Sequence, residues 1–142
     1  MTAEIVVSTF YDLRDAAAFD RAARLMLARL RLAGMEGVRS YRFLGTGLRD
    51  RRLVAICDSP ADWVELHERI SPWAESAALR AAGRLARMDV FGALSPPLRA
   101  WAETLGLGRR LRLIGDAAPL PGSEPIRRPE AGRSLFRRLA GG

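Results

Sequence analysis

Apolar residues follow two different spacings along the first two-thirds of the chain, and each spacing predicts a different element. Residues 4–11 are β-branched and aromatic and residues 38–44 alternate in character, so both segments predict strands. Residues 16–33 place apolar side chains three and four positions apart, which predicts an amphipathic helix between those strands. Residues 53–57 are almost entirely apolar, which indicates a third strand covered on both faces.

The next segment predicts a broken helix followed by a fourth strand. A serine followed by a proline at 59–60 is a helix-start signal, and the same signal recurs at 71–72. We therefore expect the helix to break there, a second piece to run over 73–86, and a strand to follow over 87–94. The order of elements, βαββαβ, predicts an α+β, ferredoxin-like fold with a four-stranded antiparallel sheet and both helices on one face. The opposite sheet face is partly apolar and needs a cover.

Residues 96–142 change in character and predict a C-terminal extension to the domain formed by residues 1–95. The Ser-Pro-Pro sequence at 95–97 predicts the start of a short helix, which Gly106 would end. Residues 110–114 alternate between basic and apolar side chains, as an additional strand would.

The net charge of +7 is concentrated near the C-terminus. All 23 basic residues are arginine; residues 1–96 hold 14 of them against 12 acidic residues, and residues 97–142 hold 9 against 4. The basic part has almost no aromatic side chains to stack on bases, so we expect no nucleic-acid partner. Within it, residues 117–133 contain four of the chain's eight prolines and predict an extended arm. The candidates there for contact with a partner subunit or with an acidic partner protein are Arg127, Arg128, Arg137 and Arg138.

The composition excludes several kinds of site and location. No apolar run approaches the length of about 18 residues that a membrane span needs, and the N-terminal sequence lacks the basic start of a secretory signal. We therefore expect a cytoplasmic protein without a membrane span. The single Cys57 and the single His67 exclude an intramolecular disulfide and a metal site built from two imidazoles of one chain. The apolar surroundings of Cys57 indicate a small buried side chain rather than a nucleophile.

Trp63 and His67 form one candidate site. They are four residues apart on a predicted helix and share one of its faces. An unperturbed histidine titrates at about pH 6.5, so His67 is the candidate catalytic residue. It could act as a general base, or it could orient a phenolic or enolic substrate beside Trp63. The alternative is a partly exposed histidine that packs against a core tryptophan.

Three further aromatic residues and one arginine are candidates for contact with an apolar substrate. Phe10, Tyr41 and Trp73 could line a cleft, although aromatic side chains also build cores. Arg42 and Arg39 lie on opposite faces of one predicted strand, so at most one of them points inward. Arg42 is our candidate for a group that polarises a carbonyl or holds an anion, with solvation at an edge strand as the alternative.

Three segments resemble the dimeric α/β-barrel superfamily. They are residues 5–10, residues 37–44 (Gly-Val-Arg-Ser-Tyr-Arg-Phe-Leu) and residues 71–77 (Ser-Pro-Trp-Ala-Glu-Ser-Ala). The superfamily includes antibiotic-biosynthesis monooxygenases, stress-responsive barrel proteins, heme-degrading monooxygenases and small polyketide cyclases. The resemblance covers residues 4–94. It implies a homodimer whose two sheets pack face to face, with a cleft for an apolar or aromatic small molecule in each subunit.

The resemblance to the antibiotic-biosynthesis type implies a cofactor-independent monooxygenase for an aromatic or polyketide-like substrate. In such an enzyme His67 would remove a proton, and the substrate carbanion would reduce oxygen directly. A polyketide-type cyclase would use the same base on a different substrate. A non-catalytic ligand-binding or assembly module would use the same cleft or the basic tail.

A second resemblance raises the question of heme. Residues 26–29, 43–47 and 71–73 resemble spheroidene monooxygenase, which implies a heme-dependent oxygenase as another alternative. The heme-degrading members of the first superfamily carry an asparagine on the first strand and a histidine late in the second helix. This sequence has serine and threonine at 8–9 and Ala78 in the helix, so it departs from that pattern.

Overall fold

The computed structural model describes residues 4–45 and 47–115. The strands in these residues are β1 (Ile5–Leu13), β2 (Val38–Gly45), β3 (Asp50–Cys57), β4 (Gly83–Phe91) and β5 (Leu111–Gly115). The helices are α1 (Ala16–Ala33), α2 (Pro60–Ile70), α3 (Ala74–Ala82) and α4 (Pro96–Thr104), followed by the short 3-10 turn η1 (Gly108–Arg110). The predicted arm at 117–133 and Arg127, Arg128, Arg137 and Arg138 lie outside the described residues.

The strands form one sheet in the order β2-β3-β1-β4-β5. The first four strands are antiparallel neighbours, and the elements follow the predicted βαββαβ order. The prediction of a four-stranded, purely antiparallel sheet is wrong, because β5 pairs with β4 in parallel and makes the sheet five-stranded and mixed. The reason is that α4 carries the chain back along β4, so the next strand meets the open edge of β4 in the same direction. The additional strand predicted at 110–114 is confirmed.

Several element boundaries differ from the prediction, including the starts of two strands. Strand β4 begins at Gly83 instead of residue 87, and β3 begins at Asp50 instead of residue 53. In β4 the early start follows from pairing, because Gly83 lies opposite Leu13 and the next residues continue the ladder with β1. A Cβ at Gly83 would lie 3.0 Å from the Leu13 side chain and 3.3 Å from Phe19, so glycine leaves room for this close approach of strand and helix. The predicted break between α2 and α3 is confirmed.

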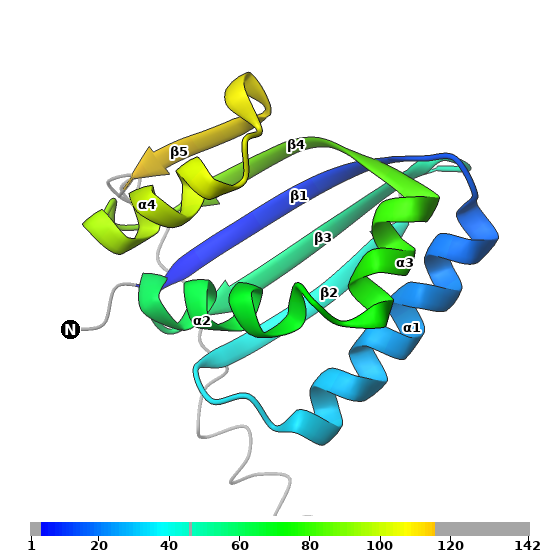
Figure 1. Cartoon of the computed structure of the whole chain (residues 1–142), viewed down its shortest axis with the longest axis horizontal. Helices are drawn as coiled ribbons and strands as arrows, with labels where there is room; N and C mark the ends of the chain where they lie inside the picture. The colour runs from blue at the N-terminus through cyan, green and yellow to red at the C-terminus, as the bar shows by residue number, and fades with distance from the viewer. Residues whose placement is uncertain (1–3, 46, 116–142) are drawn as a thin grey trace, which may run out of the picture.

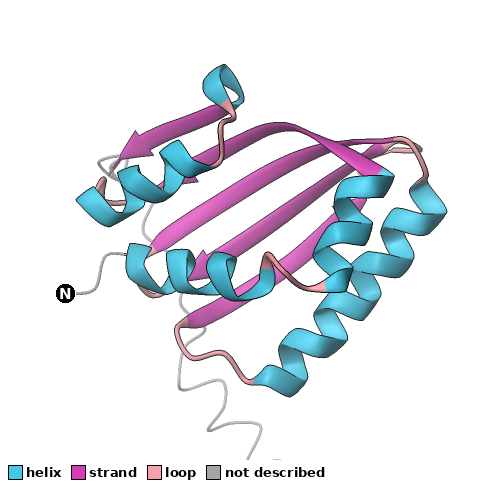
Figure 2. Cartoon of the chain, in the orientation of Figure 1, coloured by secondary structure: helices cyan, strands magenta, loops and turns pink. Residues whose placement is uncertain are grey.

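All four helices lie on one side of the sheet, with α1 and α3 packed together and α2 beside α4 (Figure 1). The alternation of β1 follows from this arrangement. Ile5, Val7 and Thr9 are fully buried beneath the helices, whereas Val6 and Phe10 point to the opposite face and are half-buried. Figure 2 shows that no described helix covers that opposite face, which we call the open face.

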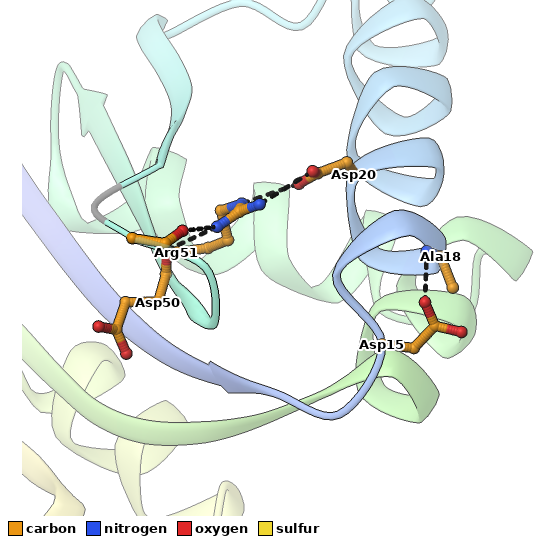
Figure 3. Close-up of polar contacts among 6 residues, drawn as sticks. Asp15, Ala18, Asp20, Asp50 and Arg51 are labelled. Carbon is orange, nitrogen blue, oxygen red and sulfur yellow. Dashed lines mark hydrogen bonds and ion pairs between the residues drawn. The ribbon is translucent and has the colours of Figure 1, made fainter.

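One arginine ties the β2–β3 hairpin to α1 (Figure 3). The Arg51 guanidinium donates to both carboxylate oxygens of Asp20, at 2.9 and 3.0 Å, and to the backbone carbonyl oxygens of Gly47 and Asp50. The Arg51 side chain holds the pKa of the Asp20 carboxyl below its ordinary value through this hydrogen bond and its charge. The same figure shows the Asp15 side chain accepting a hydrogen bond from the Ala18 amide, which caps the start of α1.

Within the described residues, no helix is both long enough and apolar enough to cross a membrane. The core instead forms between the sheet and the helices. Its largest fully buried side chains include Trp63, Phe19, Met26 and Leu66. Cys57 is also fully buried, and burial raises the pKa of its thiol to about 12, so it is a packing residue as predicted.

Candidate functional site

A cavity of about 390 Å³ lies between the sheet and the helices. Its floor is formed by the helix-facing side chains of the central strands, including Thr9, Tyr11 and Met88. Helices α2 and α3 form its walls, and Leu105 and Leu107, which follow α4, close one side. The volume lies within the range of about 300–1,000 Å³ that is usual for small-molecule sites.

Two polar atoms in the cavity wall have no hydrogen-bond partner among the described residues. They are the indole nitrogen Nε1 of Trp63 and the hydroxyl oxygen Oγ1 of Thr9. Trp63 is 2% exposed and Thr9 is 0% exposed. An unsatisfied buried donor or acceptor costs about 1–3 kcal/mol. Both atoms are buried, so a ligand in the cavity reaches them only if neighbouring side chains move apart.

His67 lies in the same wall, one turn after Trp63 on α2. Its Nδ1 accepts a hydrogen bond from Nε1 of Trp101, in α4, at 3.0 Å. Burial, together with the positive charge of Arg80, holds the pKa of His67 below its ordinary value. The imidazole is therefore neutral at neutral pH, and Trp101 occupies one of its two nitrogens.

Two tyrosines carry hydroxyl groups on the sheet side of the cavity. Tyr11 comes from β1 and Tyr41 from the edge strand β2. Burial raises the pKa of Tyr11 to about 12 and raises the pKa of Tyr41 further. Both side chains are therefore neutral phenols under ordinary conditions, able to donate a hydrogen bond to a ligand.

The charge that the cavity lining carries is positive only. Among the described residues that line it, Arg80 alone carries a full charge, and none is a carboxylate. A negatively charged or acidic ligand is therefore favoured electrostatically, and a carboxylate base is absent from this part of the wall.

Three of the six residues proposed from the sequence lie together in this cavity, namely Trp63, His67 and Tyr41. The other three, Phe10, Trp73 and Arg42, are not among its lining residues. Phe10 faces the open side of the sheet, where Arg52 and Arg87 lie over its ring at 4.0 and 4.3 Å.

Trp73 and Arg42 also have other surroundings. Trp73 packs beneath the Arg29 guanidinium, which lies 4.1 Å from its ring centroid. Arg42 is exposed and borders a separate, more open hollow of about 480 Å³ at the end of α1, which shares Tyr41 with the main cavity.

Sequence reasoning missed Thr9, Tyr11 and Trp101. Thr9 and Tyr11 flank Phe10 and therefore face the opposite side of the sheet, so Phe10 is the wrong residue of β1 for the cavity. The parity of the buried residues Ile5 and Val7 is the signal that identifies the correct face. Trp101 was assigned to the extension, and no local pattern connects it with α2.

The surroundings of His67 do not fit an axial heme ligand. A histidine that binds iron through one ring nitrogen normally donates a hydrogen bond from the other. Here Nδ1 accepts from an indole N–H, which can only donate. Across residues 4–45 and 47–115, no three His, Cys, Asp or Glu side chains gather into a group that could hold a metal ion.

Comparison with known proteins places the fold but not a family. No protein-family model matches the chain, and no curated protein matches it. Among solved structures, MupZ from Pseudomonas fluorescens is similar with a TM-score of 0.62 and 10% identity, over 88% of this chain and 95% of MupZ. SnoaB from Streptomyces nogalater, a cofactor-independent oxygenase, is similar with a TM-score of 0.55 and 16% identity, over 65% of this chain and 94% of SnoaB. At these identities the likeness is one of fold.

Proposed function

We propose that this protein is a cofactor-independent monooxygenase, of the antibiotic-biosynthesis type, that acts on an aromatic or polyketide-like compound. The observation that carries the proposal is the cavity between the sheet and the helices, whose lining residues Trp63 and Thr9 each carry a buried polar atom without a partner among the described residues. Its walls are mainly apolar, and its polar groups are neutral donors together with Arg80. The shared fold with SnoaB, a cofactor-independent oxygenase, supports the same class of reaction.

The chemistry follows from what the walls can do. A phenol or enol that enters as its anion places negative oxygen against the donors Trp63 and Tyr11, and the apolar walls exclude water. The electron-rich carbon of that anion reduces molecular oxygen directly. For a methylene group between two aryl rings, one oxygen atom becomes the new carbonyl and the other leaves as water with both hydrogens, so no external reductant is needed.

We further propose a homodimer in which a second copy covers the open face. The open face presents the half-buried aliphatic residues Val6, Val54 and Ile56, together with Phe91, which is 39% exposed. An apolar sheet face of this kind is usually packed against another layer. The partner sheet would make the barrel that the resemblance implies.

A non-catalytic ligand-binding module is the second candidate, and a specific observation favours it. The described lining of the cavity has no carboxylate, and His67 has one nitrogen occupied by Trp101. The cavity therefore lacks a strong base for substrates that must be deprotonated by the protein. This also disfavours the polyketide-type cyclase, which needs such a base. An acidic substrate that ionises by itself is compatible with oxygenation in this cavity.

Oxygen uptake in the presence of a chelator tests the proposal, with 1,8-dihydroxyanthrone as substrate because its methylene forms a stabilised anion. The matched pair is Trp63→Phe and Trp73→Phe, which remove one indole N–H inside and one outside the cavity wall. We expect Trp63→Phe to lower kcat/KM about 10- to 100-fold, and Trp73→Phe to change it less than about threefold. Tight binding of the anthrone without any oxygen uptake would instead support the binding module.

A further inference from the structure

We infer that Trp101 is a positioning residue that holds His67 in the tautomer with its proton on Nε2. His67 then presents a hydrogen-bond donor to an acceptor oxygen of the ligand, such as a carbonyl, phenolate or enolate oxygen. The tautomer is inferred from geometry alone. The role of His67 toward a substrate oxygen rests on the proposed function.

The donor and acceptor roles follow from the chemistry of the two rings. The indole Nε1 of Trp101 carries a hydrogen and has no lone pair to offer, so it can only donate. It lies 3.0 Å from Nδ1 of His67, which must therefore be the bare, accepting nitrogen. A neutral imidazole carries one hydrogen, and that hydrogen then resides on Nε2.

Several contacts hold Trp101 in place. The side chain is 4% exposed, and its ring meets the ring of Trp63 edge to face, with centroids 5.6 Å apart. The His67 ring also meets it edge to face, at 5.2 Å. Helix α4 is anchored by Leu98, which is fully buried, and Ser95 caps its first turn. A side chain packed on several sides has one orientation, so the hydrogen bond to His67 is built into the fold.

The consequence is a pair of donors on one helix face. His67 and Trp63 both line the cavity, with ring centroids 5.9 Å apart, and the Trp63 N–H has no protein partner among the described residues. Such a pair favours an oxygen that bears negative charge, because both donors strengthen as the charge develops. In this arrangement His67 is not the base. The proton of an acidic phenol or enol passes to water as the anion binds, with Arg80 supplying the attracting charge.

The tautomer can be measured directly, because His67 is the single histidine of the chain. Protein labelled with ¹⁵N-histidine gives one imidazole, and its two nitrogen shifts report which atom carries the hydrogen. We expect the Nε2–H form in the wild type at pH 8, and a mixture of both forms in Trp101→Phe, which keeps the ring but loses the N–H. Trp73→Phe is the control that leaves the spectrum unchanged. A wild-type spectrum of the Nδ1–H form would overturn the inference, whatever the activity.

Two substitutions at His67 distinguish a donor from a base. His67→Gln retains a side-chain N–H, whereas His67→Phe has neither donor nor base. A donor role predicts that kcat/KM with 1,8-dihydroxyanthrone falls less than about tenfold in His67→Gln and about 10- to 100-fold in His67→Phe. A base role predicts a loss of about 10²- to 10⁴-fold in both, which would overturn the donor role.

The closing measurement separates this inference from the proposed function. The stable compound 1,8-dihydroxyanthraquinone is titrated into the labelled protein, and the Nε2 resonance is followed. A shift of the Nε2 resonance when the wild type binds the anthraquinone supports contact between His67 and the ligand, even when no oxygen is consumed. We expect Trp63→Ala to lose this shift only if the variant no longer binds the anthraquinone. Binding with an unmoved Nε2 resonance contradicts the donor role, while oxygen uptake alone decides the monooxygenase proposal.

Discussion

The two faces of the sheet are built from alternate residues of the same strands and have become very different surfaces. On the helix-covered face, Ile5, Val7 and Val90 are fully buried. On the open face, their immediate neighbours Val6 and Phe91 retain exposure. Side chains along a strand alternate between the two faces of the sheet, so each strand contributes one set of residues to the core and the other set to the surface. Apolar residues occur in both sets.

The polar groups differ between the faces as well. The strand residues of the helix-covered face that line the cavity are uncharged, and the charged Arg51 on the same face pairs with Asp20 of α1. The open face carries charges in contact with one another, as Asp89 pairs with Arg87 at 3.2 Å and with Arg112 at 3.6 Å. Phe10 lies between two guanidinium groups on the same face. The comparison shows that one face forms the core with the helices, whereas the other carries both apolar side chains and paired charges.

The largest effect is expected from placing a carboxylate on each face in turn. Val7→Asp buries an unpaired charge under the helices and should cost several kcal/mol, a large part of the about 5–15 kcal/mol that stabilises a domain of this size. Val6→Asp, one residue earlier, should cost about 1 kcal/mol or less in the monomer. Urea denaturation followed by circular dichroism measures both. Equal destabilisation by the two variants, measured at concentrations where the wild type is monomeric, would mean that the open face is as enclosed as the other.

The same pair tests the proposed dimer. Analytical ultracentrifugation should show that the wild type is dimeric and that Val6→Asp, though folded, dissociates at concentrations where the wild type does not. A charge placed in an apolar interface has no solvent and no partner, so association weakens. If the wild type remains monomeric at all concentrations, the proposal that a second copy covers the open face is wrong.

A smaller contrast is expected for the two phenylalanines. Phe19 is fully buried, with ring contacts to Tyr11 at 5.1 Å and Phe43 at 5.9 Å, so Phe19→Ala should cost about 3–5 kcal/mol. Phe10→Ala loses packing against two arginines on the open face, and should cost about 1–2 kcal/mol. The midpoints of urea unfolding give both values, and a reversed order would contradict the assignment of faces.

The smallest effect concerns pH and His67, the histidine that lines the cavity. Because burial holds the folded-state pKa of His67 below the unfolded value of 6.5, the unfolded chain binds more protons between those two values. The contribution of His67 is therefore present above pH 6.5 and is lost as the pH falls toward the folded-state pKa. We expect the free energy of unfolding of the wild type to fall relative to His67→Phe over this window. A constant difference between the two proteins would show that His67 is not shifted.

Local patterns predicted most of the fold. The helix over 16–33, the break at 71–72 and the additional strand near 110–114 were confirmed, because caps, prolines and alternation are properties of neighbouring residues. The same patterns placed the start of β4 at 87 instead of Gly83, because residues 83–86 have helical composition but are held by the ladder with β1. Tertiary pairing overrides local propensity in such segments.

The candidate site was predicted where it depends on one helix and missed where it depends on distant segments. Trp63 and His67 share a face because they are four residues apart, and the sequence alone contains that fact. Phe10 was chosen although it faces the open side, because aromatic character, unlike strand parity, does not say which side of the sheet a residue faces. Which residues of β1 face the helices is decided by how the strand pairs with its neighbours beneath them.

Order of elements, helix starts and the apolar character of the interior were determined by the sequence itself, since each depends on interactions within a few residues. The lining of the cavity and the hydrogen bond to His67 were decided only by the tertiary structure. Trp101 lies 34 positions from His67, and the return of the chain through α4 brings the two rings together. A hydrogen bond over that separation depends on the packing of whole elements, which no local pattern encodes.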